Sequence, residues 1–325
     1  MRVSVVLCTY NGERFLGPQL ESLLAQLRLP DEIVVQDDAS SDGTWERLQA
    51  FAARARVRGV AVELQRNPAN LGYVRNFERA LQRARGDLVF LCDQDDVWHP
   101  EKIARMAARF LAEPELGLLH TDARLVDADG AWLGVDLLQA LEVSPAELEM
   151  EHSGRAFDLL MRRNLVTGAT TALRGALLGR LLPVPEGWVH DEWLAIAAAT
   201  QARVDCMPWA SIDYRQHGSN QIGARPRRLV ERLAYGWVAR RVSLERLCVL
   251  YRSFLQRIDE GGLAVEPEVR EAVAQRLRHA LARARLPRSP LRRLASVREE
   301  LGSGRYARFS FGLRSAAGDL LGLRV

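Results

Sequence analysis

Acidic and polar side chains stand directly after three short apolar runs in the first hundred residues. Cys8-Thr9-Tyr10-Asn11 follows the first run, Asp37-Asp38 follows the second, and Asp93-Gln94-Asp95-Asp96 follows the third. Carboxylates gathered in one place repel one another unless a cation or a donor-rich ligand lies between them. Mg²⁺ and Mn²⁺ prefer oxygen ligands, which carboxylates, phosphate and water supply together. These positions therefore predict a divalent metal ion bound with a phosphate ester.

The segments around these residues must form the elements that position them. Val3–Thr9, Glu32–Gln36 and Asp87–Cys92 are mainly apolar and short, which favours buried strands, and apolar residues recur at helical spacing between them. Such alternation is typical of parallel βαβ units covered on both faces, so we expect a doubly wound α/β sheet to about Thr121. The same patterns predict strands at 60–64, 116–120, 167–174 and 204–208, helices at 44–54, 158–163 and 192–200, and only helices beyond residue 225.

The acidic strand ends lie where open α/β sheets bind ligands, because that site is outside the carboxyl ends of the strands. The first strand is not followed by a GxGxxG pattern, and the chain contains no GxxxxGK[ST] pattern. A dinucleotide-binding enzyme or a P-loop NTPase would therefore lack its phosphate-binding loop. We expect a metal ion to hold the phosphates instead.

Composition limits the class of protein. The 325 residues are 48% hydrophobic and 26% charged, as in a soluble globular enzyme of one or two domains. The cysteines Cys8, Cys92, Cys206 and Cys248 are far apart and form no CxxC pair, which indicates neither a zinc ribbon nor a disulfide framework. We expect a reduced, cytoplasmic setting, with no secretory signal and no apolar run long enough to span a membrane.

Charge divides the chain into two unequal parts. Residues 225–325 carry 22 arginines and 10 acidic residues, whereas the residues before them carry 23 basic and 31 acidic residues. Lys102 is the only lysine among the 45 basic residues, a bias that we attribute to genome composition. Basic amphipathic helices can pack on a neighbouring domain, lie on an anionic membrane, or bind nucleic acid. We expect no nucleic acid here, because no known binding module is present.

Four segments, followed by two weaker ones, occur in the order found in the inverting family 2 glycosyltransferases of the GT-A fold and resemble that family. The resemblance covers most of residues 1–220 and implies a GT-A catalytic domain over 1–224, in which a mixed, doubly wound sheet is flanked by helices. About 1–121 would bind the nucleotide sugar and about 122–224 the acceptor, and 225–325 would be an arginine-rich helical extension. The matching segments are Val3–Asn11, Ile33–Thr44, Asn70–Gly72 and Phe90–Trp98, continued weakly in His190–Trp193 and Tyr214–His217.

The resemblance assigns roles to individual residues. Asp38, with Asp37, would hold the base and ribose of the donor, and Asp93 and Asp95 resemble the DxD pair that binds Mn²⁺ or Mg²⁺ on the diphosphate. Asp191 stands where the family has its general base, and His217 resembles a late histidine that reaches the metal or the diphosphate. The expected donor-binding residues are Cys8, Thr9, Tyr10, Asn11, Asp37, Asp38, Asn70, Gly72, Asp93 and Gln94.

These residue types suit the implied reaction. A departing nucleoside diphosphate needs a cation for its developing charge, and an acceptor hydroxyl needs a carboxylate to take its proton. One base and one displacement invert the anomeric centre without a second catalytic carboxylate. We therefore expect a metal-dependent transferase that moves a sugar to a glycan or lipid-linked glycan in bacterial surface-polysaccharide assembly. The Asp-Gln-Asp-Asp-Val-Trp form is similar to that of rhamnosyltransferases.

Other interpretations of the same residues remain open. The acidic residues at 37–38, 93–96 and 191–192 could cap helices or lie in solvated loops, and His217 could be an ordinary histidine. The chain could also be a nucleotidyltransferase, although that class normally has a glycine-rich basic loop after its first strand. A third interpretation is a non-catalytic nucleotide- or glycan-binding protein on a transferase scaffold. The resemblance also suggests peripheral contact with the inner face of the plasma membrane through 225–325.

Overall fold

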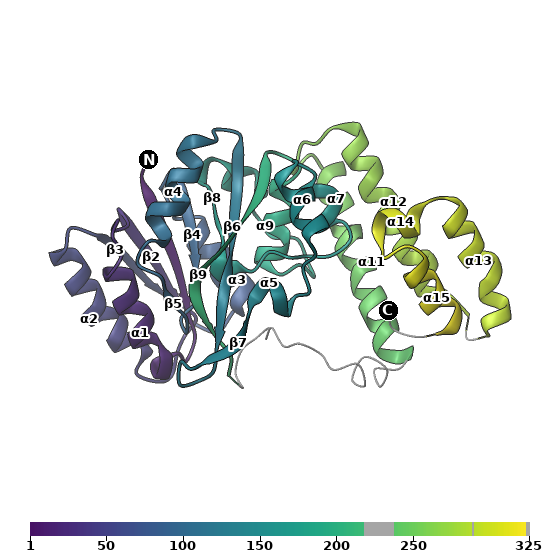
Figure 1. The fold of residues 1–325 in the computed structure, drawn as a ribbon. Coiled ribbons are helices and arrows are strands. Elements are labelled where there is room, and N and C mark those ends of the chain that lie inside the picture. Colours follow the sequence, from purple (N-terminus) through teal and green to yellow (C-terminus); the bar gives the residue numbers. More distant parts are fainter. Residues whose placement is uncertain (218–236, 288, 323–325) are drawn as a thin grey trace. The chain divides into compact units, whose positions relative to one another are not determined.

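The computed structural model describes residues 1–217, 237–287 and 289–322, which form two compact units (Figure 1). Unit 1 contains residues 1–156, 165–184 and, of the described residues, 189–217, and unit 2 contains 157–164, 185–188 and the C-terminal helices. Two short segments that precede residue 189 thus belong to unit 2. The predicted domain boundary at 224/225 lies outside the described residues.

Unit 1 is built on one mixed sheet with the strand order β3-β2-β1-β4-β8-β6-β9-β5, and β7 pairs with β6. The pairs β1–β2, β2–β3, β1–β4 and β6–β9 are parallel, whereas the other pairs are antiparallel. The strands are β1 Val3–Thr9, β2 Glu32–Asp37, β3 Ala61–Arg66, β4 Leu88–Cys92, β5 Val97–Trp98, β6 Leu116–Val126, β7 Trp132–Asp136, β8 Ala172–Arg174 and β9 Arg203–Arg215.

Helices flank the sheet (Figure 1), which explains why every residue of β1, β2 and β4 is buried. Helix α1, for example, buries Leu16, Leu20 and Leu23, which recur at helical spacing. The helices of unit 1 are α1 Glu13–Leu24, α2 Thr44–Val57, α3 Tyr73–Leu81, α4 Lys102–Ala112, α5 Leu137–Ala140, α6 Pro145–His152, α8 Leu178–Leu181 and α9 His190–Ala198, with the 3-10 helices η1 Gly168–Thr170 and η2 Gly175–Leu177. The expected mixed α/β sheet flanked by helices is confirmed.

Register brings the chemistry-bearing strand ends to one edge of the sheet. Thr9 pairs with Asp37 across β1 and β2, and Leu7 pairs with Cys92 across β1 and β4. The residues that follow these three parallel strands therefore leave the sheet at nearly the same level. This is the edge at which the sequence predicts a ligand.

Some predicted strands differ from the structure in extent. The predicted strand 167–174 is a 3-10 turn followed by only three strand residues, because the amides of Thr170 and Thr171 bond back to the carbonyls of Thr167 and Gly168. The predicted strand 204–208 continues to residue 215, because Pro208 lies in an irregularity of the β6–β9 pairing after which the strand resumes. The segment 127–149, which has no clear period, contains β7, α5 and most of α6.

Unit 2 is helical, and some of its arginines form ion pairs and hydrogen bonds within the unit. The described helices are α11 Trp237–Asp259, α12 Pro267–Ala284, α13 Pro290–Gly302, α14 Arg305–Phe309 and α15 Leu313–Leu321, while α7 Ala156–Leu160 lies mostly in this unit. Arg283 binds Asp319 at 2.7 Å, and buried Arg293 donates to the carbonyls of Pro287 and Asp319. Each described helix of the chain is too short or too polar to cross a lipid bilayer.

Candidate active site

The loop after β4 carries the acidic residues of the predicted metal site. Asp96 is buried, and its Oδ1 accepts the amide of Arg215 at 3.0 Å. Its Oδ2 is also buried and has no hydrogen-bond partner among the described residues. Burial, followed by the charges of Asp95 and Asp191, raises the pKa of Asp93 to about 7. Several carboxylates thus share a site that does not neutralise them fully.

The end of β9 meets this loop from more than a hundred residues away in the sequence. His217 Nε2 lies 2.8 Å from Asp95 Oδ2, and the imidazole stacks on the Phe15 ring with 4.4 Å between centroids. The Nε of Arg215 donates to the Asp95 carbonyl at 2.8 Å and so anchors the loop backbone. The structure therefore brings His217 and Asp95 together, as the resemblance implies.

Asp191 lies in the first turn of α9, and two backbone amides hold its carboxylate. Its Oδ2 accepts from Gly168 at 2.9 Å, and its Oδ1 accepts from Glu192 at 2.7 Å. Both bonds fix the orientation of the carboxylate. The charge of Asp191 contributes, after burial and the charge of Asp95, to the raised pKa of Asp93, so the two carboxylates lie within electrostatic reach of each other. Asp191 is also a first-turn acid, as the simpler interpretation expects, so its position serves both interpretations.

Lys102 is the residue of this site that sequence analysis missed. Its side chain is fully buried, donates to the Ala169 carbonyl at 2.6 Å and lies 3.7 Å from the centroid of the Trp98 ring. Burial lowers the pKa of Lys102 to about 7, against the opposing effect of the carboxylates of Asp96 and Asp93. Its ammonium therefore lies between the acidic loop and η1, which holds Asp191. A signal existed, because Lys102 is the only lysine in an arginine-rich chain.

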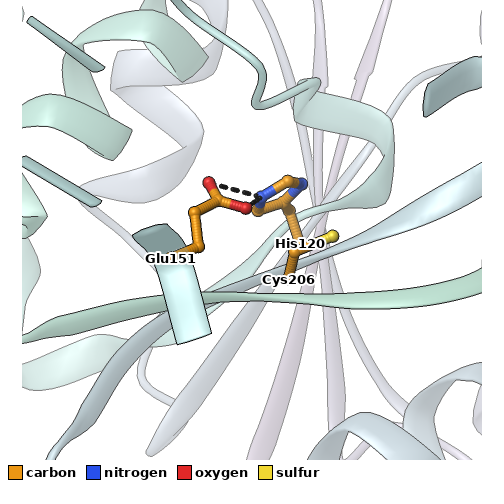
Figure 2. Close-up of side chains that lie close together, drawn as sticks. All are labelled: His120, Glu151 and Cys206. Carbon is orange, nitrogen blue, oxygen red and sulfur yellow. Dashed lines mark hydrogen bonds and ion pairs between the residues drawn. The ribbon is translucent and has the colours of Figure 1, made fainter. Parts of the chain in front are cut away.

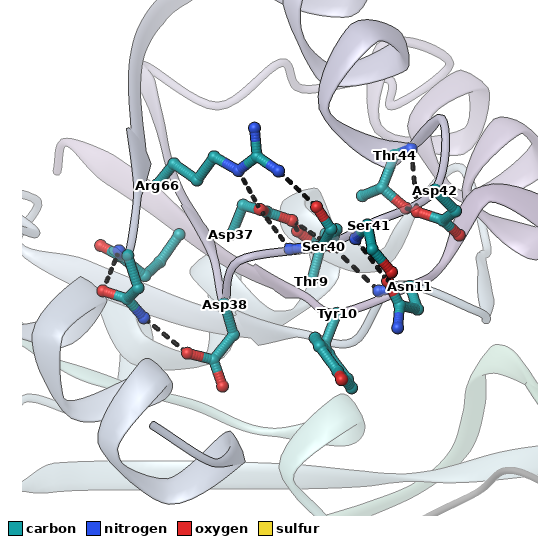
Figure 3. Close-up of polar contacts among 12 residues, drawn as sticks. Thr9, Tyr10, Asn11, Asp37, Asp38, Ser40, Ser41, Asp42, Thr44 and Arg66 are labelled. Atoms are coloured by element: carbon teal, nitrogen blue, oxygen red, sulfur yellow. Dashed lines mark hydrogen bonds and ion pairs between the residues drawn. The ribbon is translucent and has the colours of Figure 1, made fainter. Parts of the chain in front are cut away.

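Asp37 and Asp38 connect the loops at the part of the sheet edge where the nucleotide sugar is expected (Figure 3). Asp37 is buried and accepts from Thr9 Oγ1 at 2.9 Å and from the amide of Ser40 at 3.0 Å. Asp38 is buried and accepts from Asn67 Nδ2 at 2.7 Å, and from the amides of the segment 71–72 at 2.8 and 2.9 Å. Both carboxylates thus shape the loops that surround the predicted nucleotide site.

The loop 70–72 is held from two sides. Gly72 has a φ of +82°, a left-handed conformation that favours glycine, and its amide donates to both Asp38 and Asn70 Oδ1. Asn70 is exposed beside this turn. The structure therefore connects Asp38 directly with Asn70 and Gly72, which the sequence grouped only by resemblance.

Gln94 joins the acidic loop to the loop after β1. Its side-chain amide pairs with the Tyr10 backbone, since Oε1 accepts the Tyr10 amide at 2.8 Å and Nε2 donates to the Tyr10 carbonyl at 3.1 Å. A Cβ on Gly12 would lie 2.2 Å from Gln94 Oε1, so this pairing requires glycine at position 12. Asn11, with a φ of 47°, donates its amide to Ser40 Oγ. Burial, followed by the charge of Asp93, raises the pKa of the Cys8 thiol.

The donor atoms of the acidic loop fit a hard divalent cation. Asp93, Asp95 and Asp96 offer carboxylate oxygens, and one Asp96 oxygen is buried without a partner among the described residues. His217 adds an imidazole nitrogen beside Asp95. Oxygen ligands from one or two carboxylates, completed by phosphate and water, are what Mg²⁺ and Mn²⁺ take in phosphate-binding sites.

Comparisons with known proteins identify similar sequences. Residues 4–133 match the model of glycosyl transferase family 2. An uncharacterized protein of Mycobacterium tuberculosis is 26% identical over 66% of this chain and 59% of its own length. The uncharacterized glycosyltransferase YwdF of Bacillus subtilis is 26% identical over 72% of this chain and 83% of its own length. The succinoglycan biosynthesis protein ExoO of Rhizobium meliloti is 32% identical over 46% of this chain and 36% of its own length.

Solved structures show the same fold. TarS of S. aureus in complex with UDP-GlcNAc superposes with a TM-score of 0.52 at 20% identity, over 87% of this chain and 80% of that chain. The mannosyltransferase PcManGT of Pyrobaculum calidifontis, in complex with GDP-Man and Mn²⁺, superposes with a TM-score of 0.53 at 19% identity. This match covers 94% of this chain and 75% of that chain. The mixed sheet therefore has the GT-A architecture. The match to the mycobacterial relatives spans 59% of their length.

Proposed function

We propose that this chain is a metal-dependent, inverting family 2 glycosyltransferase that moves a sugar from a nucleoside diphosphate to an acceptor hydroxyl. One observation carries the proposal: His217 lies 2.8 Å from Asp95 in the acidic loop at the carboxyl edge of a GT-A sheet, and Asp191 is near enough for its charge to help raise the pKa of Asp93 in the same loop. The match of residues 4–133 to glycosyl transferase family 2 supports it. So do the nucleotide sugars bound by the two structural neighbours.

Asp93, Asp95 and His217 would hold the metal ion. A bound Mn²⁺ or Mg²⁺ supplies Lewis-acid stabilisation of the negative charge that develops on a departing diphosphate. His217 is fixed for this task by its stack on Phe15. Lys102 lies behind the same loop with its pKa lowered to about 7, and its protonated form lets carboxylates approach one another before any metal binds.

Asp191 would act as the base that takes the proton of the acceptor hydroxyl. Each of its oxygens accepts one backbone amide, which leaves a lone pair on each for the acceptor. The two amide bonds fix the orientation of the carboxylate. A single displacement assisted by this one base inverts the anomeric centre.

The donor nucleotide would lie along the loops after β1, β2 and β4. Asp37 and Asp38 hold these loops in shape, and Asp38 is assigned to the ribose and base. Tyr10 and Asn11 are held against this edge by Gln94 and Ser40. The acceptor would be a glycan or a lipid-linked glycan bound by residues of the 122–224 half. Assembly of a surface polysaccharide is favoured because the similar ExoO protein acts in succinoglycan biosynthesis.

The test is a screen of nucleotide sugars by thermal shift with Mn²⁺ and with a chelator. The panel should include UDP-GlcNAc, GDP-mannose and a deoxythymidine-diphosphate rhamnose, since the motif form resembles that of rhamnosyltransferases. We expect at least one compound to raise the Tm only with metal, and Asp95→Asn to abolish that shift. Asp129→Asn, which changes an exposed aspartate in the loop between β6 and β7, is the matched control. A shift unaffected by chelator and by Asp95→Asn would refute the metal assignment.

We also propose that residues 225–325 contact an anionic membrane surface. Leu291 on α13 and Leu313 on α15 are 86% and 77% exposed, and each is followed by an exposed arginine. Basic residues near anionic lipid contribute about 1 kcal/mol each, and exposed leucines can enter the lipid interface. Vesicles with anionic lipid should bind the full chain, and Leu291→Ser with Leu313→Ser should weaken binding. Leu27→Ser, at a leucine in unit 1 that is 74% exposed, should not. Equal binding by all three proteins would contradict this proposal.

A further inference from the structure

Unit 1 buries a cluster of three metal-ligating side chains from separate elements, His120 on β6, Glu151 on α6 and Cys206 on β9. His120 is 1% exposed, and the other two are fully buried. The register of β6 against β9 places His120 directly opposite Cys206. One donor atom of each side chain lies within 4.8 Å of the other two, and Figure 2 shows the three side chains converging.

The histidine and the glutamate do not make a close ion pair. His120 Nε2 lies 3.2 Å from both carboxylate oxygens of Glu151, so one N–H would be shared between two long contacts. Charge-assisted pairs of this kind normally measure about 2.7 to 2.9 Å. Elsewhere in this chain, His279 lies 2.6 Å from Glu300 and His152 lies 2.6 Å from Asp205. A fully buried carboxylate held only by long, divided contacts is poorly compensated.

The spacing suits ligands of a metal ion. Nitrogen and oxygen ligands about 2.0 to 2.1 Å from a tetrahedral ion lie roughly 3.3 Å from each other, close to the distance between His120 and Glu151. The thiol of Cys206, which also hydrogen-bonds to His120, adds a third possible ligand atom. Among the described residues, no fourth histidine, cysteine or carboxylate joins the group. Water or a backbone oxygen would complete a tetrahedron.

The donor set selects the kind of metal. Sulfur and imidazole nitrogen with one carboxylate are the ligands of Zn²⁺, whereas Mg²⁺ and Mn²⁺ take sites made mainly of oxygen. We propose that His120, Glu151 and Cys206 bind a structural Zn²⁺ ion that fastens α6 to the β6–β9 strand pair. This site is separate in chemistry from the acidic loop after β4 and does not depend on the proposed transferase activity.

The experiment measures metal in the purified full-length chain. After dialysis against metal-free buffer, elemental analysis should find about one zinc per chain in the wild type and almost none in Cys206→Ala. Cys248→Ala, which changes another buried cysteine, should keep its zinc. The Tm of the wild type should fall to that of Cys206→Ala when a strong chelator removes the metal.

A second measurement needs no variant. Co²⁺ added to the metal-stripped wild type should produce the near-ultraviolet thiolate-to-cobalt charge-transfer band, and equimolar Zn²⁺ should remove it. Mn²⁺ or Mg²⁺ at the acidic loop gives no such band, so this readout is independent of the donor site. Zinc content equal in the wild type and Cys206→Ala would overturn the proposal, as would a titration without the band. The cluster would then be a buried His–Glu pair beside a thiol.

Discussion

Asp191→Asn separates the proposed chemistry of the base from its structural task. In the wild type the two carboxylate oxygens accept one amide each, from Gly168 and from Glu192. An asparagine keeps the size of the side chain but offers only one acceptor oxygen, so its NH₂ group must face one of these two amides. The variant therefore loses the proton acceptor and also leaves one backbone donor without a partner.

The cost in stability can be estimated from that contact. A buried donor left without a partner costs about 1 to 3 kcal/mol, which corresponds to a fall in Tm of roughly 2 to 12 °C for a unit of this size. The folded state still dominates well below that Tm. Loss of a positioned general base costs about 10² to 10⁴ in rate. We therefore expect Asp191→Asn to be folded and slightly less stable, with transfer reduced by at least about 10²-fold.

The assay combines transfer rate with donor binding on the same preparation. Calorimetry should give near-native affinities for Mn²⁺ and for the nucleotide sugar in Asp191→Asn, while release of nucleoside diphosphate falls. Glu192→Gln, one position along the same helical turn, is the control and should transfer at close to the wild-type rate. Wild-type activity in Asp191→Asn would refute the assignment and make Glu192 the first candidate. Loss of donor binding together with activity would instead make Asp191 part of the donor site.

Four further predictions concern the candidate site. Because a metal ligand must be ionised and the pKa of Asp93 is raised to about 7, Mn²⁺ affinity should fall about tenfold per pH unit below 7, and calorimetry that finds no such dependence would contradict this. In the metal-free chain, Asp93 keeps its proton in the folded state up to about pH 7 but loses it near pH 4 in the unfolded state. The free energy of unfolding, measured with urea, should therefore fall as the pH rises from about 4 to about 7. Lys102→Met removes the buried amino group, and with chelator present we expect the free energy of unfolding to fall by about 1 to 3 kcal/mol. An unchanged urea midpoint would mean that the hydrogen bond from Lys102 to the Ala169 carbonyl does not stabilise the fold. Gly12→Ala should displace Gln94 and weaken nucleotide binding in calorimetry, because the new Cβ would lie 2.2 Å from its Oε1, whereas Gly17→Ala, with nothing within 4 Å, should not.

Local sequence predicted correctly the features that depend on a single strand. Val3–Thr9 and Leu88–Cys92 are continuous apolar runs, which only strands covered on both faces tolerate, and both are fully buried strands. The acidic residues after them lie at one sheet edge because parallel strands share a direction. Sequence pattern alone thus placed Asp37, Asp38 and Asp93 at the ligand edge.

Strand propensity gave the wrong extent where local side-chain hydrogen bonds or long-range strand pairing outweighed it. Thr167 to Arg174 has the composition of a strand, but the hydroxyls of Thr170 and Thr171 donate to the Thr167 carbonyl, and their amides donate to the carbonyls of Thr167 and Gly168, which turns the chain. Pro208 suggests the end of a strand, yet pairing with β6 continues beyond it to residue 215. That continuation carries His217 to Asp95, so the length of β9 bears directly on the candidate metal site.

The sequence by itself determined the class of fold and the loop that carries the candidate metal ligands, because strand periodicity and strand-end residues are local properties. Only the tertiary structure decided which distant residues join that loop. Asp191 and His217 reach it through α9 and β9, and Lys102 becomes its buried counter-charge, although its spacing in the sequence gave no reason to expect this. The raised pKa of Asp93 and the cluster at His120 likewise arise from burial among residues that meet only in the folded chain.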